Sequence, residues 1–82
     1  MKKTKNVLLS MKAHKRLRDN YHKKALSERA KGDSSALSEF KFFYHNDCWL
    51  FISRYNRKMT KAEKKEVFEN RKFDFRHELK IK

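Results

Sequence analysis

The sequence is almost free of residues that break regular structure. It contains no proline, a single glycine at Gly32 and a single cysteine at Cys48 among 82 residues. Because proline and glycine are the strongest local markers of turns, the one glycine marks the clearest boundary in the chain. One cysteine cannot form an intrachain disulfide, which excludes the small disulfide-stabilised domains typical of secreted proteins.

The sequence also lacks a long hydrophobic run. No apolar stretch approaches the length of about 18 residues that a membrane-spanning helix requires. A basic start at Lys2 and Lys3 is followed by the apolar triplet Val7-Leu8-Leu9, which is too short for a signal peptide. We therefore expect no membrane span and a reducing, cytoplasmic location.

Acidic residues are scarce relative to basic ones. Lysine and arginine number 23 against 10 aspartate and glutamate, which gives a formal net charge of +13. The excess is uneven, because residues 1–31 carry a net +9, residues 32–56 a net −1 and residues 57–82 a net +5. Such an excess is typical of proteins that bind a polyanion, with nucleic acid first among the candidates.

The length of the chain predicts one small basic domain that spans residues 1–82, with residues 1–5 as a disordered basic tail. A domain of this size buries only about 60–65% of the surface that its unfolded chain exposes, so the core is small. Seven of the 11 aromatic residues lie between Phe40 and Tyr55, inside the neutral middle segment. The expected arrangement is an aromatic centre with a basic segment on each side.

The segment before Gly32 is predicted to be one long helix, from about Asn6 or Ser10 to Ala30. Largely apolar residues recur there at steps of three and four, the period of an amphipathic helix. They are Val7, Met11, His14, Leu17, Tyr21 and Ala25. On the opposite side of the helical wheel, four cations fall within roughly 40° of one another. These are Lys5, Lys12, Arg16 and Lys23. Gly32 is expected to end this helix.

The aromatic middle segment fits two structures. As a β-hairpin, residues 40–45 and 48–53 would be strands joined by Asn46 and Asp47, which tolerate the positive φ of a tight turn. As a helix, the segment has apolar residues at steps of three and four. They are Leu37, Phe40, Tyr44, Cys48, Phe51 and Tyr55. Residues 45–48 are four weak helix formers in a row, so the hairpin is slightly favoured.

Two signals describe the C-terminal part. Thr60 and Glu63 have the spacing of a capping box, which predicts a helix over residues 61–70. Over residues 73–82 apolar and charged residues alternate, broken only at His77, which predicts a half-buried strand. A helical alternative places three apolar residues on one side: Phe68, Phe75 and Leu79.

Together these elements predict an α+β fold: a long N-terminal basic helix, a β-hairpin, a short helix and a C-terminal strand. If residues 6–10 form a strand before the helix, the order becomes β-α-β-β-α-β, which is ferredoxin-like. The helical interpretations of residues 36–56 and 73–82 give instead an all-α three-helix bundle. Topology carries no function in either case.

Basic helix faces are the predicted contact with phosphates. Lysine gives point-charge contacts, so we expect little sequence specificity. The candidate residues are Lys5, Lys12, Lys15, Arg16, Lys23, Lys24, Arg29, Lys61, Lys64, Lys65, Arg71 and Lys72. Exposed aromatic rings beside basic residues stack on bases in proteins that bind single strands. The candidates for this role are Tyr44, Trp49 and Tyr55.

Signals for a metal site or for catalysis are weak. His45 and Cys48 are spaced to share a metal ion, but a structural zinc site needs four ligands. Cys48 stands in an apolar run, where a thiol is usually inert. Small basic ribonucleases can work with histidine, tyrosine, arginine and lysine, but nothing in the sequence brings such residues together. We therefore expect no metal, no cofactor and no enzymatic activity.

These patterns predict a small non-enzymatic protein that binds nucleic acid, either DNA or RNA, through the phosphate backbone. The alternative is a small basic regulator or inhibitor that docks on an acidic surface of a protein partner such as a polymerase or nuclease. Complementary charge directs protein encounters as well, so both hypotheses rest on the same residues. Neither hypothesis fixes an oligomeric state.

Overall fold

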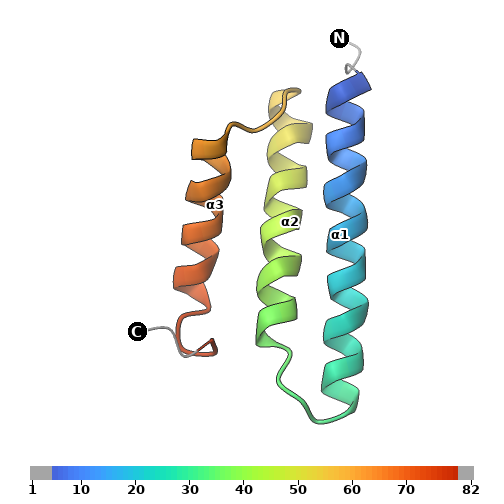
Figure 1. Ribbon diagram of the computed structural model, residues 1–82, viewed down its shortest axis with the longest axis vertical. Helices are drawn as coiled ribbons and strands as arrows, with labels where there is room; N and C mark the ends of the chain where they lie inside the picture. Colours follow the sequence, from blue (N-terminus) through green and yellow to red (C-terminus); the bar gives the residue numbers. More distant parts are fainter. Residues whose placement is uncertain (1–4, 80–82) are drawn as a thin grey trace.

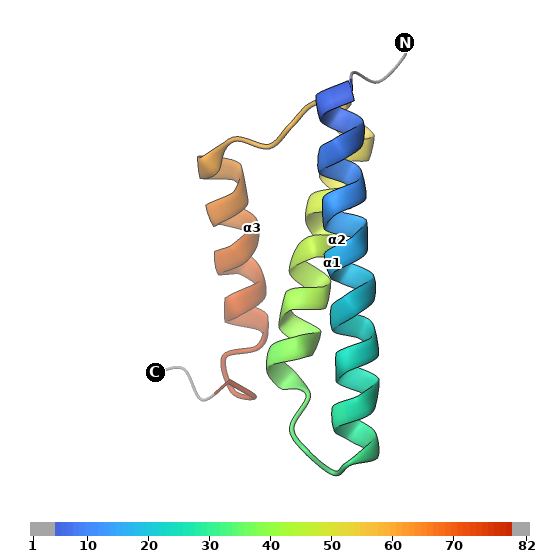
Figure 2. The same cartoon turned by 45° about the vertical axis from the view of Figure 1, so that its right-hand side comes forward.

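The computed structural model describes residues 5–79, which form three helices joined by short connections (Figure 1). They are α1 (Lys5–Ala30), α2 (Ala36–Tyr55) and α3 (Lys61–Asp74). The helices lie side by side with α2 in the middle, and α1 runs antiparallel to α2 (Figures 1 and 2). The molecule is elongated along the helices, with principal dimensions of 45 × 27 × 15 Å. Because α2 packs against both neighbours, it organises the whole array.

The end of α1 is fixed by the single glycine, as the sequence predicts. Gly32 has a φ of +79°, in the left-handed region that glycine adopts without steric cost. Its N–H donates to the Arg29 carbonyl at 3.0 Å, and the Asp33 N–H donates to the Glu28 carbonyl at 2.9 Å. These two bonds form a Schellman motif, which satisfies carbonyls that the helix itself leaves open.

The residues of α1 that lie against α2 repeat at alternating steps of four and three, the spacing of a coiled-coil seam. They are Val7, Met11, His14, Arg18, Tyr21, Ala25 and Glu28. The facing residues of α2 repeat in the same way. They are Ser38, Phe42, His45, Trp49 and Ile52. At one end of the seam the Ser38 hydroxyl donates to Glu28, and at the other end Val7 and Ile52 share the core.

The predicted β-hairpin is wrong, because residues 36–55 form one continuous helix. Asn46 and Asp47, which the hairpin placed in its turn, both find partners on neighbouring helices. Arg18 of α1 donates from Nη1 to Asn46 Oδ1 at 3.2 Å. Arg71 of α3 donates twice to Asp47, from Nε at 2.5 Å and from Nη2 at 3.0 Å. Contacts with both neighbours thus override the low helix propensity of this segment.

The start of α3 confirms the predicted capping box. The Glu63 N–H donates to Thr60 Oγ1 at 3.2 Å, and the Thr60 N–H donates to Glu63 Oε1 at 2.9 Å. Arg57 also donates to both oxygens of Glu63, at 2.8 and 2.7 Å. The Arg57 bonds, together with those from Thr60, lower the pKa of Glu63 to about 2. The helix therefore begins at Lys61 as predicted, although it continues to Asp74.

The predicted C-terminal strand is wrong in its described part. Residues 73–74 complete α3 and residues 75–79 form turns, whereas residues 80–82 lie outside the described residues. Phe75 follows the end of α3 and packs against α2, with its ring centroid 6.1 Å from that of Phe40 and 5.9 Å from that of Phe43. The alternating pattern therefore reflects one aromatic anchor rather than a strand.

The α+β expectation, with its ferredoxin-like variant, is consequently wrong, and the all-helical alternative agrees with the structure. Residues 6–10 belong to α1 instead of forming a strand. Of the predicted tail, Lys5 begins α1, and residues 1–4 lie outside the described part of the chain. Within residues 5–79 no helix is both long and apolar enough to cross a membrane.

One cluster of buried side chains lies at the end of the array where α1 begins, and Ala25, Ala36 and Phe40 are buried towards the other end. The buried members of the cluster are Val7, Cys48, Ile52 and Met59, and partly buried residues pack around them. Helix α3 buries none of its own residues. It is held by half-buried contacts, among them the Phe68 ring at 5.1 Å from Phe40. The stability of this fold therefore depends on few fully buried side chains.

We expect Ile52→Ala to lower the free energy of unfolding by about 2–5 kcal/mol, because Ile52 is fully buried in this cluster. Leu50→Ala on the same helix is the matched control, since Leu50 is 50% exposed and its truncation should cost no more than about 0.5 kcal/mol. Urea unfolding followed by circular dichroism measures both. Equal losses would contradict the assignment of the buried face of α2.

Candidate functional site

The side of α1 that faces away from α2 carries a row of cations. Its members are Lys5, Lys12, Arg16 and Lys23, all exposed, and we call this row the α1 cationic face. At a rise of about 1.5 Å per residue, the row extends for about 27 Å along the helix. Because the buried seam lies on the opposite side, the whole length of the row is open to solvent.

Within residues 5–79 no ion pair neutralises the α1 cationic face, although Asp19 lies three residues after Arg16 and four before Lys23. In the described range, every ion pair involves an arginine and none involves a lysine. Asp19, the acidic residue nearest to the row, accepts a hydrogen bond from Arg18 Nε at 3.2 Å. The second acidic residue of α1, Glu28, accepts from Ser38 within the seam. The positive potential of the row therefore faces solvent.

Three further predicted contacts on α1 have different surroundings. Lys15 and Lys24 are exposed and extend the basic surface around the helix. Arg29 is also exposed, but its guanidinium forms an ion pair with Glu39 of α2 and donates from Nε to Ser35 Oγ at 3.3 Å. Arg29 thus links the end of α1 to the start of α2, and only part of its charge remains available to a ligand.

The predicted basic patch on α3 is separate from the α1 cationic face, since α2 lies between the two helices (Figure 1). Three of its residues are exposed: Lys61, Lys64 and Lys65. The same helix also carries three glutamates: Glu63, Glu66 and Glu69. Arg71 is bound to Asp47 and lies 3.6 Å from Asp74, and Lys72 is half-buried. The positive charge of α3 is therefore offset by acidic residues to a greater extent than that of the α1 cationic face.

The three aromatic candidates also differ in position. Tyr44 is half-buried against Phe68, and burial, with a smaller effect of Cys48, raises its pKa to about 12. Trp49 lies in the seam with the Arg18 guanidinium 5.3 Å from its ring. Of the three, only Tyr55 is exposed, at 54%, and the guanidinium groups of Arg54 and Arg57 lie over its ring. Tyr44 and Trp49 therefore pack helices together.

The middle of the seam holds a histidine pair that the sequence did not reveal. His14 Nδ1 lies 3.1 Å from His45 Nδ1, and the His45 ring stacks on Tyr21. Burial, followed by the charges of His14 and Lys41, lowers the pKa of His45 to about 4. Burial, followed by Lys64 of α3, lowers the pKa of His14. Both imidazoles are therefore neutral near pH 7, and one donates to the other.

Metal and thiol chemistry find no support in this arrangement. Across residues 5–79, no group of three or more histidine, cysteine, aspartate and glutamate side chains is placed to hold a metal ion. Cys48 is fully buried, and burial raises the pKa of its thiol to about 11. The thiol is therefore protonated and shielded at neutral pH.

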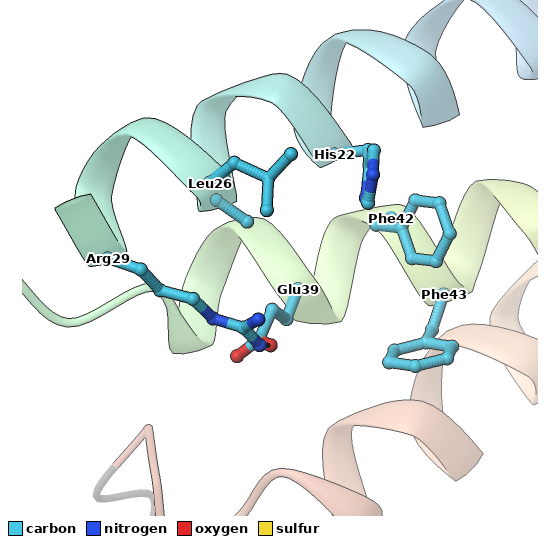
Figure 3. A pocket seen from close by; sticks show the side chains of 7 residues that line it. His22, Leu26, Arg29, Glu39, Phe42 and Phe43 are labelled. Atoms are coloured by element: carbon cyan, nitrogen blue, oxygen red, sulfur yellow. Dashed lines mark ion pairs between the residues drawn. The ribbon is translucent and has the colours of Figure 1, made fainter.

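A small open pocket lies between α1 and α2, with a volume of about 190 Å³ (Figure 3). Its main lining residues are His22, Leu26 and Arg29 from α1 and Glu39, Phe42 and Phe43 from α2. Figure 3 shows Arg29 and Glu39 together at one end of the pocket and the three rings towards the other end. Sequence reasoning missed this site because its walls come from two helices whose register is set only by folding. The adjacent rings at positions 42 and 43 were the only local signal.

No family model, curated protein or solved structure matches this chain. Its function must therefore be inferred from its own geometry and charge. The two features that support such an inference are the α1 cationic face and the pocket between α1 and α2.

The histidine pair should make the protein less stable as the pH falls from about 6.5 towards 4. In that interval the unfolded chain binds protons at both imidazoles, whereas the folded pair binds fewer because its pKa values are lowered, so acid favours unfolding. The decline should be smaller in the double variant His14→Gln/His45→Gln, measured by urea unfolding at several pH values. The control His22→Gln/His77→Gln changes two exposed histidines and should decline like the parent protein. A pair variant that declines as steeply as the parent would refute the assignment.

Proposed function

We propose that this protein binds nucleic acid by placing the α1 cationic face along a phosphate backbone. The observation that carries the proposal is the exposure of these four cations on one side of a continuous helix, where none of them forms an ion pair with another residue of the described range. A helix that presents a straight row of charge suits a linear polyanion. The net charge of +13 would also accelerate the encounter at low salt.

The expected mechanism is electrostatic. Each phosphate that a cation neutralises releases condensed counterions, and this release supplies most of the affinity of sequence-independent binding. Lysine ammonium groups act as point charges and position the protein on the backbone without reading base edges. Three of the four residues of the α1 cationic face are lysines, which favours binding with little sequence preference.

Charge density distinguishes nucleic acid from an acidic protein surface. Duplex DNA carries one negative charge per about 1.7 Å of helix axis, so a row of about 27 Å faces many phosphates at once. A folded protein surface rarely presents carboxylates in an unbroken row of this length. The same row can nevertheless attract an acidic protein, so poly-glutamate of equal charge serves as a competitor. Efficient displacement of nucleic acid by this competitor would favour the protein partner.

Charge reversal of the row should reduce binding more than an equal change elsewhere. We expect Lys12→Glu/Arg16→Glu/Lys23→Glu to weaken binding of a labelled duplex at least about tenfold, because three phosphate contacts become repulsive. The matched control Lys58→Glu/Lys61→Glu/Lys65→Glu gives the same net charge from three exposed lysines, one just before α3 and two in its first turns, and should bind more tightly than the α1 variant. Fluorescence anisotropy measures both affinities, and circular dichroism checks helicity. Equal losses would show that only total charge matters.

The salt dependence should report the number of phosphates in contact. Four contacts predict a slope of about −3.6 for log affinity against log salt on duplex DNA. The α1 triple variant should have a much flatter slope, whereas the α3 variant should keep nearly the parent slope. A slope near zero for the parent protein would contradict binding through the phosphate backbone.

A further inference from the structure

The pocket between α1 and α2 lies next to the α1 cationic face. Leu26, which forms part of the pocket wall, is three residues beyond Lys23, the last cation of the row. Residues three apart on a helix are surface neighbours, with about 5–6 Å between their Cβ atoms. A phosphate held at Lys23 would therefore have the pocket within reach of its own nucleotide.

The walls of the pocket suit a flat aromatic ring. The His22 ring centroid is 5.4 Å from that of Phe42, and the Phe42 centroid is 5.2 Å from that of Phe43. Leu26 is 50% exposed and supplies an apolar wall facing these rings (Figure 3). A volume of about 190 Å³ is smaller than the about 300–1,000 Å³ of ordinary small-molecule sites, so a single ring suits it better than a larger ligand.

The other end of the pocket offers complementary polar groups. Glu39 accepts from the Ser35 hydroxyl at 3.2 Å and pairs with Arg29, and its carboxylate oxygens retain further acceptor capacity. Arg29 has N–H donors beyond those used by Ser35 and Glu39. A donor and an acceptor side by side match the edge of any nucleobase, which presents both kinds of group once it is unpaired.

We infer that this pocket binds one unpaired nucleobase of a single strand whose phosphates lie on the α1 cationic face. The inference rests on the proposed function and narrows it, because a base can enter the pocket only when it is not paired. The base stacks against the rings of His22 and Phe42, and its polar edge meets Arg29 and Glu39. The protein then prefers single strands to duplexes of equal charge, with the row supplying salt-dependent attraction and the pocket supplying the preference.

The decisive probes differ by one base. One is an abasic 12-mer that keeps every phosphate, and the other is the same strand with one central thymidine. If the pocket takes a base, the parent protein binds the thymidine strand at least about fivefold more tightly, as expected for one stacked base. Equal affinity for both strands overturns the inference and leaves the proposed function intact. Absence of binding to both strands, and to duplex DNA, overturns the proposed function itself.

Variants locate the effect in the pocket. His22→Ala/Leu26→Ala changes two exposed pocket residues without altering net charge, so it should erase the thymidine preference and leave the affinity for the abasic strand unchanged. The matched control Leu9→Ala/Leu17→Ala changes two exposed apolar residues of α1 outside the pocket and should retain the preference. Phe42→Leu keeps apolar volume in the seam while removing the ring, and should lower the preference with helicity preserved. A preference that survives both pocket variants contradicts the assignment.

Discussion

The antiparallel packing of α2 against α1 is the contact on which the other features depend. It occupies one side of α1 from Val7 to Glu28, which leaves the opposite side to solvent along its whole length. It also brings the polar residues in the middle of α2 to partners, so that this segment remains helical. The position of both features follows from this seam. The α1 cationic face lies on the opposite side of α1, and the pocket lies between α1 and α2 at the edge of the seam.

Local sequence signals predicted where α1 ends and where α3 begins, whereas the helical structure of α2 depends on contacts with the other helices. Gly32 and Thr60 signal a helix end and a helix start within a few residues, and both signals hold in the structure. The stripe of α2 that meets α1 includes Ser38 and His45, which look like surface residues in the sequence. Their partners lie 10 and 31 residues away, so no periodicity of apolar residues reveals the stripe. The aromatic run and its weak helix formers then favoured the wrong structure.

The part of the candidate site that makes no contact with another helix could be predicted from the sequence. A helical wheel places Lys5, Lys12, Arg16 and Lys23 together, because exposed charges follow the helix period and nothing else. The same wheel cannot show that Arg29 and other arginines are bound to carboxylates on different helices. The planar guanidinium suits such bidentate and bridging contacts, whereas lysine is a hydrated point charge. In the part of the chain that is described, the ion pairs between helices use arginine, whereas no lysine forms an ion pair.

The cationic charge on α1 lowers the stability of a fold whose core is small. Lys12 and Arg16 are four residues apart on one helix face, an arrangement that destabilises an isolated helix by a few tenths of a kcal/mol, about 0.2–0.5. The seam with α2 offsets this repulsion, because it fixes the helix through residues that do not share the charged side. A bound polyanion would replace the repulsion with attraction and would stabilise only the folded chain, in which the cations are aligned. Under the proposed function, the cations that destabilise the free protein are therefore the ones that the bound ligand neutralises.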